Sequence, residues 1–167
     1  MEQLIESLAK NRKTEVWFEE TAFSNLLTRP LRTQGILRFT PPAGLEKHIT
    51  APYDERYLVE GDTVLVESKT KGTNRTLSLH DYPALRAFIE AFRSTLANDI
   101  ITLRHFYRVT LQGDPRRWIL ILRPLDHDVQ ALVESIRFSG EMERVSRIEI
   151  LAPDGDRSVM VISTDAP

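Results

Sequence analysis

The segment GILRFTPPAGL, residues 35–45, alternates apolar and polar side chains and then stops at two prolines. Successive side chains of a β-strand point to opposite faces, so Leu37 and Phe39 fall on one apolar face. Proline has no backbone N–H to donate to a central ladder, so the strand ends there. The alternation resumes at once with Leu45 and Ile49. The segment therefore predicts two half-apolar strands joined at a stiff corner, with something apolar lying against them.

Short alternating segments on both sides of this corner predict an antiparallel sheet. Short turns such as Gly61-Asp62, Ser139-Gly140 and Asp154-Gly155 separate them, and short turns favour antiparallel neighbours. We expect about ten strands. They lie near residues 14–25, 32–40, 44–51, 56–60, 63–68, 73–78, 107–111, 118–122, 131–138, 144–151 and 158–163.

One segment between the two groups of strands has the period of a helix. In DYPALRAFIEAFRSTLAND, residues 81–99, apolar side chains recur at helical spacing and form one stripe. Asp81 can cap a helix over 81–97, and Pro83 suits its first turn. The first eleven residues predict a shorter helix that ends near Asn11. The two stripes consist of Leu85, Phe88, Ile89, Phe92 and Leu96 in the long helix and Leu4, Ile5 and Leu8 in the first one.

These elements predict one α+β domain over residues 1–167, a curved antiparallel sheet with helices covering one face. A chain of 167 residues is long enough for one sizeable core. The helical stripes and the apolar strand faces lie against each other in such a fold. The space between them is either a filled core or a cavity, because periodicity gives the same pattern for both.

Composition narrows the classes of partner. The 22 basic and 24 acidic residues are scattered along the chain and give a net charge of −2. They form no basic stripe, so we expect no nucleic-acid partner. The chain has no cysteine, which excludes disulfides and thiolate metal sites. No apolar run approaches the roughly 18–20 residues of a membrane span.

The motifs of the sequence do not indicate an enzyme. It has no nucleophile elbow, phosphate-binding glycine loop or zinc-protease helix. Asp126, His127 and Asp128 form the most metal-like triplet, but no second ligand cluster accompanies them, and we interpret them as a solvated loop. The sequence DGD at 154–156 lacks the later acidic ligands of a calcium loop and predicts a hairpin turn. We therefore expect no catalytic residue, no metal and no cofactor.

Several motifs in order along the chain resemble the outer-membrane lipoprotein carrier (LolA-like) family. The pattern F-x-E at Phe18–Glu20 is followed by GILRFTPPAGL and then by APYDERYLVEGDTVLV at 51–66. Further on, GDPRRWILILRP at 113–124 resembles the family's Trp-containing strand. The segment IRFSGEMERVSRIEILAPDGD at 136–156 resembles its closing meander. The similarity spans nearly the whole chain and fits a divergent branch of the family.

This resemblance implies a half-open β-barrel with helices as a lid over a hydrophobic cavity. It also implies a periplasmic protein of a Gram-negative bacterium, with a signal peptide removed before Glu2. Family members carry the acyl chains of lipoproteins or other lipids between membranes without catalysis. The implied partners are therefore a lipid or acylated-protein cargo, an inner-membrane exporter and an outer-membrane acceptor, and we expect a monomer with a mobile lid. The proline corner would turn the edge of the sheet toward that lid. The expected cavity residues are Leu4, Ile5, Leu8, Leu37, Phe39, Leu45, Ile49, Leu85, Phe88, Ile89, Phe92 and Leu96.

Two other functions stay open at the level of the sequence. A domain of the same shape can sense misplaced lipid or lipoprotein instead of carrying it, since fold alone does not fix function. A small hydrolase that uses Asp126, His127 and Asp128 is the alternative from another class. The standard carriers also place an arginine before the corner proline, where it ties down the lid, and this chain has Pro41 there. That departure puts lid closure by such an arginine, and the standard lipoprotein cargo, in question.

Overall fold

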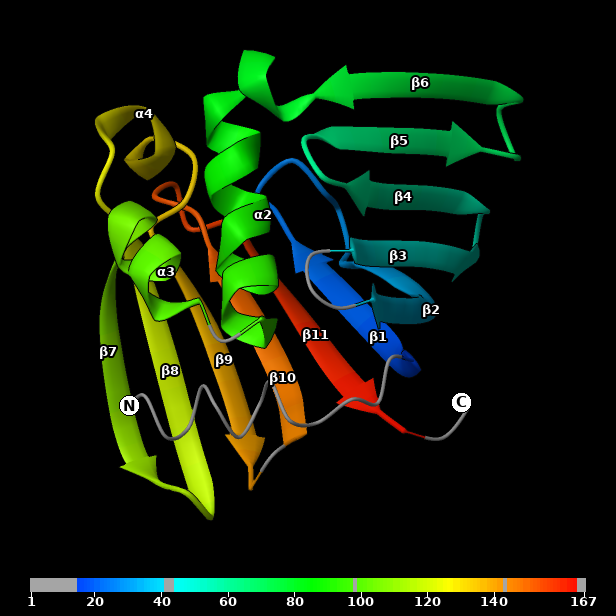
Figure 1. The fold of residues 1–167 in the computed structure, drawn as a ribbon. Helices are drawn as coiled ribbons and strands as arrows, with labels where there is room; N and C mark the ends of the chain where they lie inside the picture. The colour runs from blue at the N-terminus through cyan, green and yellow to red at the C-terminus, as the bar shows by residue number, and fades with distance from the viewer. Residues whose placement is uncertain (1–14, 41–43, 98, 143, 165–167) are drawn as a thin grey trace.

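The computed structural model describes residues 15–40, 44–97, 99–142 and 144–164. Most of them form one sheet (Figure 1). Its strands are β1 (Glu15–Phe23), β2 (Leu31–Thr40), β3 (Gly44–Ala51), β4 (Glu55–Glu60), β5 (Thr63–Ser68), β6 (Thr73–Ser78), β7 (Tyr107–Asp114), β8 (Arg117–Pro124), β9 (Ser135–Glu141), β10 (Arg144–Leu151) and β11 (Arg157–Ser163). The helices are the short 3₁₀ turn η1 (Leu79–Asp81), α2 (Pro83–Leu96), α3 (Ile100–Phe106) and α4 (His127–Gln130).

The sheet has eleven strands in the order β6-β5-β4-β3-β2-β1-β11-β10-β9-β8-β7, and every neighbouring pair is antiparallel. The first described strand pairs with the last, so β1 and β11 join the two groups of strands. The sheet is curved, and β6 and β7 remain its two edges. This arrangement confirms the predicted α+β class and the half-open barrel.

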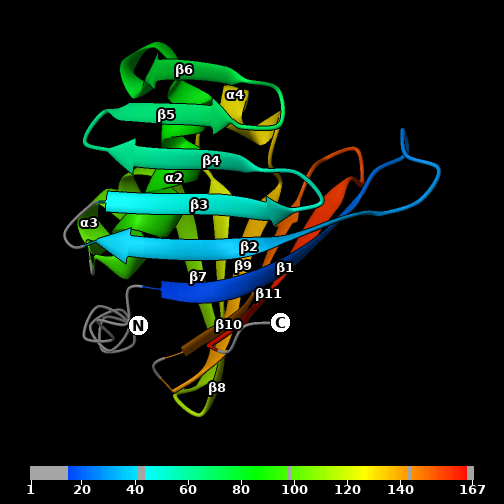
Figure 2. The same cartoon turned by 90° about the vertical axis from the view of Figure 1, so that its right-hand side faces the viewer.

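The helices lie on the concave side of the sheet. In Figure 1, α2 crosses this side, and in Figure 2, turned by 90°, strands β2–β6 lie in front of it. Pro83 occupies the first turn of α2, where a missing N–H costs nothing. The residue at the N-cap is Tyr82 rather than the predicted Asp81, which belongs to η1. The helix predicted over 81–97 is therefore shorter at its N-terminal end.

A β-bulge at Thr50 of strand β3 lies opposite Gln34 and Gly35 of β2. The pairing shifts between Gln34 and Gly35, which face Ala51 and Ile49. A Cβ atom at Gly35 would lie 1.9 Å from the carbonyl oxygen of His48, so no other residue fits this close approach of two backbones. The glycine that opens the segment 35–45 therefore serves the curvature of the sheet.

Two short helices were not predicted from the sequence. Asp99 caps α3 by accepting a hydrogen bond from the Thr102 backbone N–H at 3.1 Å. Asp126 caps α4 by accepting hydrogen bonds from the backbone N–H groups of Asp128 and Val129. The loop predicted at 126–128 is thus wrong, because Asp126 starts a helical turn, but the three residues are exposed to solvent as expected.

The strand and turn predicted around residues 131–140 also need correction. Strand β9 begins only at Ser135, and Gly140 lies inside it, opposite Trp118. A Cβ atom at Gly140 would lie 2.5 Å from the Trp118 ring, so this glycine marks close packing rather than a turn. The chain turns instead between Glu141 and Arg144.

Strands β2 and β3 do not form an edge of the sheet. They lie between β1 and β4, which overturns the expectation that the proline corner turns a sheet edge. Residues 41–43 are outside the described residues. The apolar faces of β2 and β3 still point to the concave side, because alternation within each strand determines the face.

The main core lies on the half of the sheet formed by β7, β8 and β9. Trp118, Leu120 and Phe138 are almost fully buried there, and Leu103 of α3 packs into the same cluster. A smaller cluster lies under the other end of α2, around Val59, Val64, Leu79 and Ile89. Between these clusters the sheet and α2 are not in full contact.

Candidate functional site

A cavity of about 910 Å³ lies between α2 and the concave face of the sheet. Side chains from α2, β1–β5 and β9–β11 line it, and most of them are aliphatic or aromatic. Periodicity does not distinguish a filled core from a cavity. The structure shows that a cavity lies between the apolar face of the sheet and α2. Apolar wall residues beyond those predicted include Val16, Ala22, Leu31, Val59, Val64, Phe138, Val145, Ile148, Ile150, Met160 and Ile162.

Every predicted cavity residue that the structure describes borders this space. They come from β2, β3 and α2, and they are Leu37, Phe39, Leu45, Ile49, Leu85, Phe88, Ile89, Phe92 and Leu96. The remaining three, Leu4, Ile5 and Leu8, lie outside the described residues. The alternation of the strands and the helical stripe were thus enough to select one continuous wall.

Aromatic rings connect the wall to the core. The rings of Phe88 and Phe92 meet edge to face with centroids 5.1 Å apart, and Phe92 meets Phe138 in the same way at 5.4 Å. Phe138 is almost fully buried and belongs to the core cluster of β8 and β9. Such edge-to-face contacts fix ring positions, so this side of the cavity has a defined shape.

Buried polar contacts anchor α2 to the sheet. Arg93 donates hydrogen bonds to Glu90 and to the carbonyl oxygen of Gly61 in the β4–β5 turn. The hydroxyl of Ser94 donates to the other oxygen of Glu90 at 2.7 Å. All three side chains are buried, which favours a fixed wall over a mobile lid at this helix.

Tyr107 provides a second anchor for α2. Its hydroxyl donates a hydrogen bond to the carbonyl oxygen of Ala87. Burial, with a smaller contribution from the nearby Glu90 carboxylate, raises the pKa of Tyr107 above its ordinary value. The hydroxyl therefore stays protonated and remains a donor.

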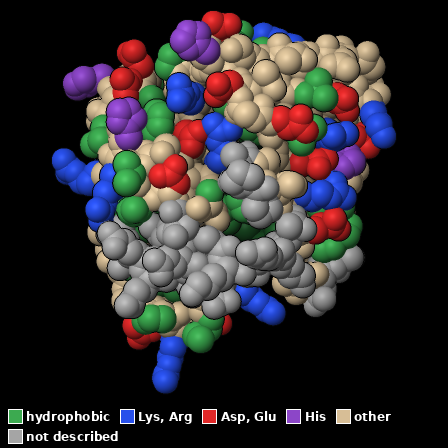
Figure 3. Space-filling view, in the orientation of Figure 1, with side chains coloured by type: hydrophobic (Ala, Val, Ile, Leu, Met, Phe, Trp, Pro, Cys, Tyr) green, Lys and Arg blue, Asp and Glu red, His purple; other side chains and the backbone are tan. Residues whose placement is uncertain are grey.

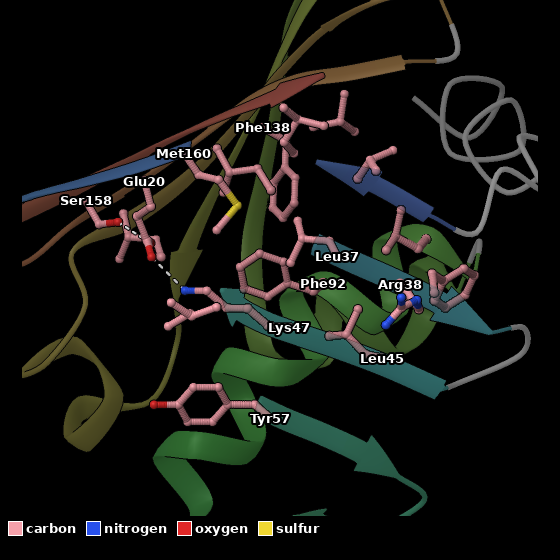
Figure 4. Close-up of a pocket in the computed structure, with 18 of the residues that line it drawn as sticks. Glu20, Leu37, Arg38, Leu45, Lys47, Tyr57, Phe92, Phe138, Ser158 and Met160 are labelled. Atoms are coloured by element: carbon pink, nitrogen blue, oxygen red, sulfur yellow. Dashed lines mark hydrogen bonds and ion pairs between the residues drawn. The ribbon is translucent and has the colours of Figure 1, made fainter. Parts of the chain in front are cut away.

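Three polar side chains interrupt the apolar wall at one side. Lys47 Nζ lies 2.6 Å from Glu20 Oε1, and the hydroxyl of Ser158 donates to Glu20 Oε2 at 2.6 Å. Figure 4 shows this group on one side of the cavity and Arg38 on the other, with apolar side chains such as Phe92 between them. The cavity is thus apolar in its middle and has polar side chains at both of these sides.

Sequence reasoning missed this group, although the sequence contains a signal for it. Lys47 shares a face of β3 with Leu45 and Ile49, and Glu20 shares a face of β1 with Phe18. A charged residue on an otherwise apolar strand face is unusual and must find a partner. Lys47 on β3 and Glu20 on β1, however, come from strands that are separated by β2, so no local pattern predicts their contact.

Two tyrosines border the same side of the cavity. Tyr57 faces Lys47 on the neighbouring strand, and its hydroxyl donates a hydrogen bond to Glu55. Partial burial, followed by the charges of Glu55 and Glu20, raises the pKa of Tyr53. The Tyr53 phenol therefore stays neutral near pH 7 and adds a hydroxyl group without adding charge.

Arg38 belongs to the outer face of β2, and its side chain reaches the rim of the cavity. It forms ion pairs with Glu15 at 2.9 Å and Glu46 at 3.4 Å. The hydrogen bond to Glu15 is the largest cause that raises the pKa of this guanidinium, although partial burial opposes the rise. On the molecular face shown in Figure 3, basic and acidic side chains of the described residues are interspersed.

The residues considered for catalysis do not meet at this cavity. Asp126 is used as the cap of α4, and no group of three or more His, Asp or Glu side chains that could hold a metal occurs in the described ranges. His48 Nε2 lies 3.0 Å from Asp54 Oδ1, but His48 alternates with the cavity residues Lys47 and Ile49 and so points to the convex face.

Solved structures with the same architecture span nearly the whole chain. The LolA superfamily protein NE2245 from Nitrosomonas europaea is 12% identical, with a TM-score of 0.50, and the match covers 99% of this chain and 94% of that one. An uncharacterized conserved protein from Thermus thermophilus is 9% identical, with a TM-score of 0.54, and the match covers 99% of this chain and 87% of that one. At these identities the similarity shows the fold alone, a half-open sheet with helices on its concave side.

The sequence itself gives the family. The family model described as outer membrane lipoprotein carrier protein LolA-like matches residues 1–166. The chain therefore belongs to this LolA-like family, which confirms the resemblance seen in its strand motifs. No curated protein sequence matches the chain.

Proposed function

We propose that this chain binds the acyl chains of lipids or lipoproteins in the cavity beneath α2 and carries them through the periplasm between membranes, without catalysis. The cavity supports this proposal most directly. It is large, apolar in its middle and walled by one continuous set of side chains from the sheet and α2. Membership of the LolA-like family adds support from the sequence.

The energetics of such a cavity fit a carrier. Each methylene that leaves water contributes roughly 0.8 kcal/mol, so ten methylenes contribute about 8 kcal/mol. A bilayer offers a similar gain for each methylene. Loading from one membrane and release into another can therefore both occur without a large net change in free energy.

The location and partners follow from the same proposal. We infer a periplasmic monomer that meets an inner-membrane exporter and an outer-membrane acceptor. No helix in the described part of the chain is long and apolar enough to cross a membrane.

Two variants of β11 test whether ligands bind in the cavity. Ile162 lines the cavity, and its neighbour Val161 is 50% exposed and points to the other face. Ile162→Asp should abolish the fluorescence enhancement of the apolar probe N-phenylnaphthylamine, whereas Val161→Asp should leave it unchanged. Equal probe binding in both variants, with native circular dichroism, would overturn the proposed site. Mass spectrometry of an organic extract of the purified protein would identify a retained lipid.

A transfer assay separates a carrier from a lipid-sensing domain. Protein loaded from donor vesicles that contain a fluorescent phospholipid should deliver it to acceptor vesicles. Binding without any transfer would contradict the carrier function and favour the sensor. Release of free fatty acid during the assay would instead indicate hydrolysis.

A further inference from the structure

The Lys47–Glu20 pair lies in a place where charge is costly. Both side chains are mostly buried, with 29% and 16% of their surface exposed, and both line the cavity. Lys47 Nζ also lies 5.4 Å from the centroid of the buried Phe18 ring. An apolar residue at each position would fill the same wall without the cost of desolvating two charges. The pair therefore calls for an explanation beyond packing.

The glycine at position 35 of β2 makes this pair possible. Lys47 is on β3 and Glu20 on β1, so the lysine side chain must cross β2, which lies between them. Gly35 sits on β2 directly opposite Phe18 and Ile49 and has no side chain of its own. The lysine stem can therefore pass over this position, above the Phe18 ring, and reach the carboxylate.

Within the described ranges of the chain, Lys47 has unused hydrogen-bond donors, whereas both carboxylate oxygens of Glu20 already accept a hydrogen bond. Each carboxylate oxygen of Glu20 already accepts one hydrogen bond, from Lys47 and from Ser158. An ammonium group has three N–H donors, and among the described residues Glu20 is the acceptor found for Lys47. The group thus has donor capacity left on a cavity wall while its charge is already balanced.

We propose that Lys47, Glu20 and Ser158 form a subsite for the carbonyl group of an ester- or amide-linked acyl chain. This inference rests on the proposed function and specifies the class of cargo. A neutral carbonyl oxygen can accept a spare N–H of Lys47 without disturbing the ion pair. The carboxylate of a free fatty acid would compete with Glu20 and leave one negative charge unbalanced in apolar surroundings. The cavity therefore selects acylated glycerol or acylated protein over free fatty acid.

Competition between two ligands of equal chain length tests this selection. Monododecanoylglycerol and dodecanoate should each displace bound N-phenylnaphthylamine, measured at about pH 8, where the fatty acid is ionised. We expect the ester to displace the probe at a concentration about tenfold lower, which corresponds to about 1.4 kcal/mol. A dodecanoylated peptide should match the ester if the acyl linkage alone is recognised. A peptide that binds as weakly as dodecanoate would restrict the subsite to glycerol esters and overturn the inclusion of acylated protein.

The variant Glu20→Gln should bind dodecanoate more tightly, and a misfolded variant would not show such an increase in affinity. It releases Lys47 as an unbalanced cation, so dodecanoate should bind at least about tenfold more tightly and the preference for the ester should disappear. Glu19→Gln is the matched control, because Glu19 is the neighbouring exposed residue of β1 and loses the same charge. An unchanged preference in Glu20→Gln would overturn the subsite and leave the cavity intact. Absence of probe binding in the unmutated protein would instead overturn both proposals.

Discussion

Arg93 of α2 and Gly61 of the β4–β5 turn are joined by a hydrogen bond from the guanidinium to the carbonyl oxygen, across 32 positions of the sequence. Glu90 holds the same guanidinium in place, and Ser94 donates to Glu90. The helix that covers the cavity is therefore attached to the sheet through its buried polar side. Under the proposed function, a lipid ligand would have to enter and leave the cavity while this attachment holds, or break it.

Removal of the arginine should destabilise the fold strongly. Arg93→Met leaves the buried Glu90 carboxylate without its cation, and such a loss costs about 3–5 kcal/mol of unfolding free energy. The double variant Arg93→Met/Glu90→Gln should be more stable than the single one, because no buried charge remains. Urea unfolding measures both. A loss below about 1 kcal/mol in the single variant would show that α2 is not anchored by this contact.

Two leucine truncations should distinguish the cavity wall from the core. Leu120 is fully buried in the core, so Leu120→Ala should cost about 3–5 kcal/mol. Leu37 borders the cavity and has fewer neighbours to lose, so Leu37→Ala should cost less than about 2 kcal/mol and should still reduce probe affinity. Chemical denaturation and probe titration on the same samples provide the comparison. Equal losses of stability would mean that the hollow is filled in solution.

Substitution of Gly35 should damage both the sheet and the polar subsite. The Cβ atom of Gly35→Ala would meet the His48 carbonyl oxygen at 1.9 Å, so β2 and β3 must move apart. Overpacking of this kind costs about 1–3 kcal/mol. Thermal unfolding should show the loss, and the preference for ester over fatty acid should weaken as the crossing of Lys47 is disturbed. An unaltered melting temperature would argue against the close approach of Gly35 to the His48 carbonyl oxygen.

Stability should fall at alkaline pH because of Tyr107. Its pKa is raised in the folded state, so the folded protein keeps a proton that the unfolded chain has released above the ordinary tyrosine value of about 10. The contribution is complete below that value and is lost progressively as the pH rises from it toward and through the raised pKa of the folded protein. Urea unfolding at several pH values above about 10 measures the slope.

Tyr107→Phe is the control for this pH dependence. It should unfold with a shallower dependence on alkaline pH, and at neutral pH it should be less stable by about 1 kcal/mol through the lost hydrogen bond to Ala87. A slope equal to that of the unmutated protein would assign the alkaline transition to another group.

Local periodicity explains how much of this fold could be predicted. Alternation placed Leu37 and Leu45 on the face that borders the cavity, and helical spacing did the same for Phe88 and Phe92. These patterns extend over at least four residues and reflect burial directly. The pairing of β1 with β11 joins the two ends of the described chain, and no local pattern encodes it.

Short elements and long-range contacts explain what could not be predicted. Helices α3 and α4 have seven and four residues, too few to show a period, and only the caps at Asp99 and Asp126 indicate them. The sequence alone predicts a turn at Gly140, because a glycine required by close packing against Trp118 has the same sequence signal as a glycine in a turn. The contact of Lys47 with Glu20 depends on the order of three strands.

A cavity next to a well-packed core allows the cavity wall to change in evolution more easily than the core. A residue such as Leu120 is surrounded on all sides, so its replacement is opposed by its neighbours. Leu45 borders the cavity, so a larger or smaller side chain there mainly changes the cavity volume that a ligand can occupy. Because proteins tolerate substitutions that keep them above a threshold of stability, the shape of the hollow can drift in small inherited steps. The same fold can in this way acquire the ability to bind different ligands.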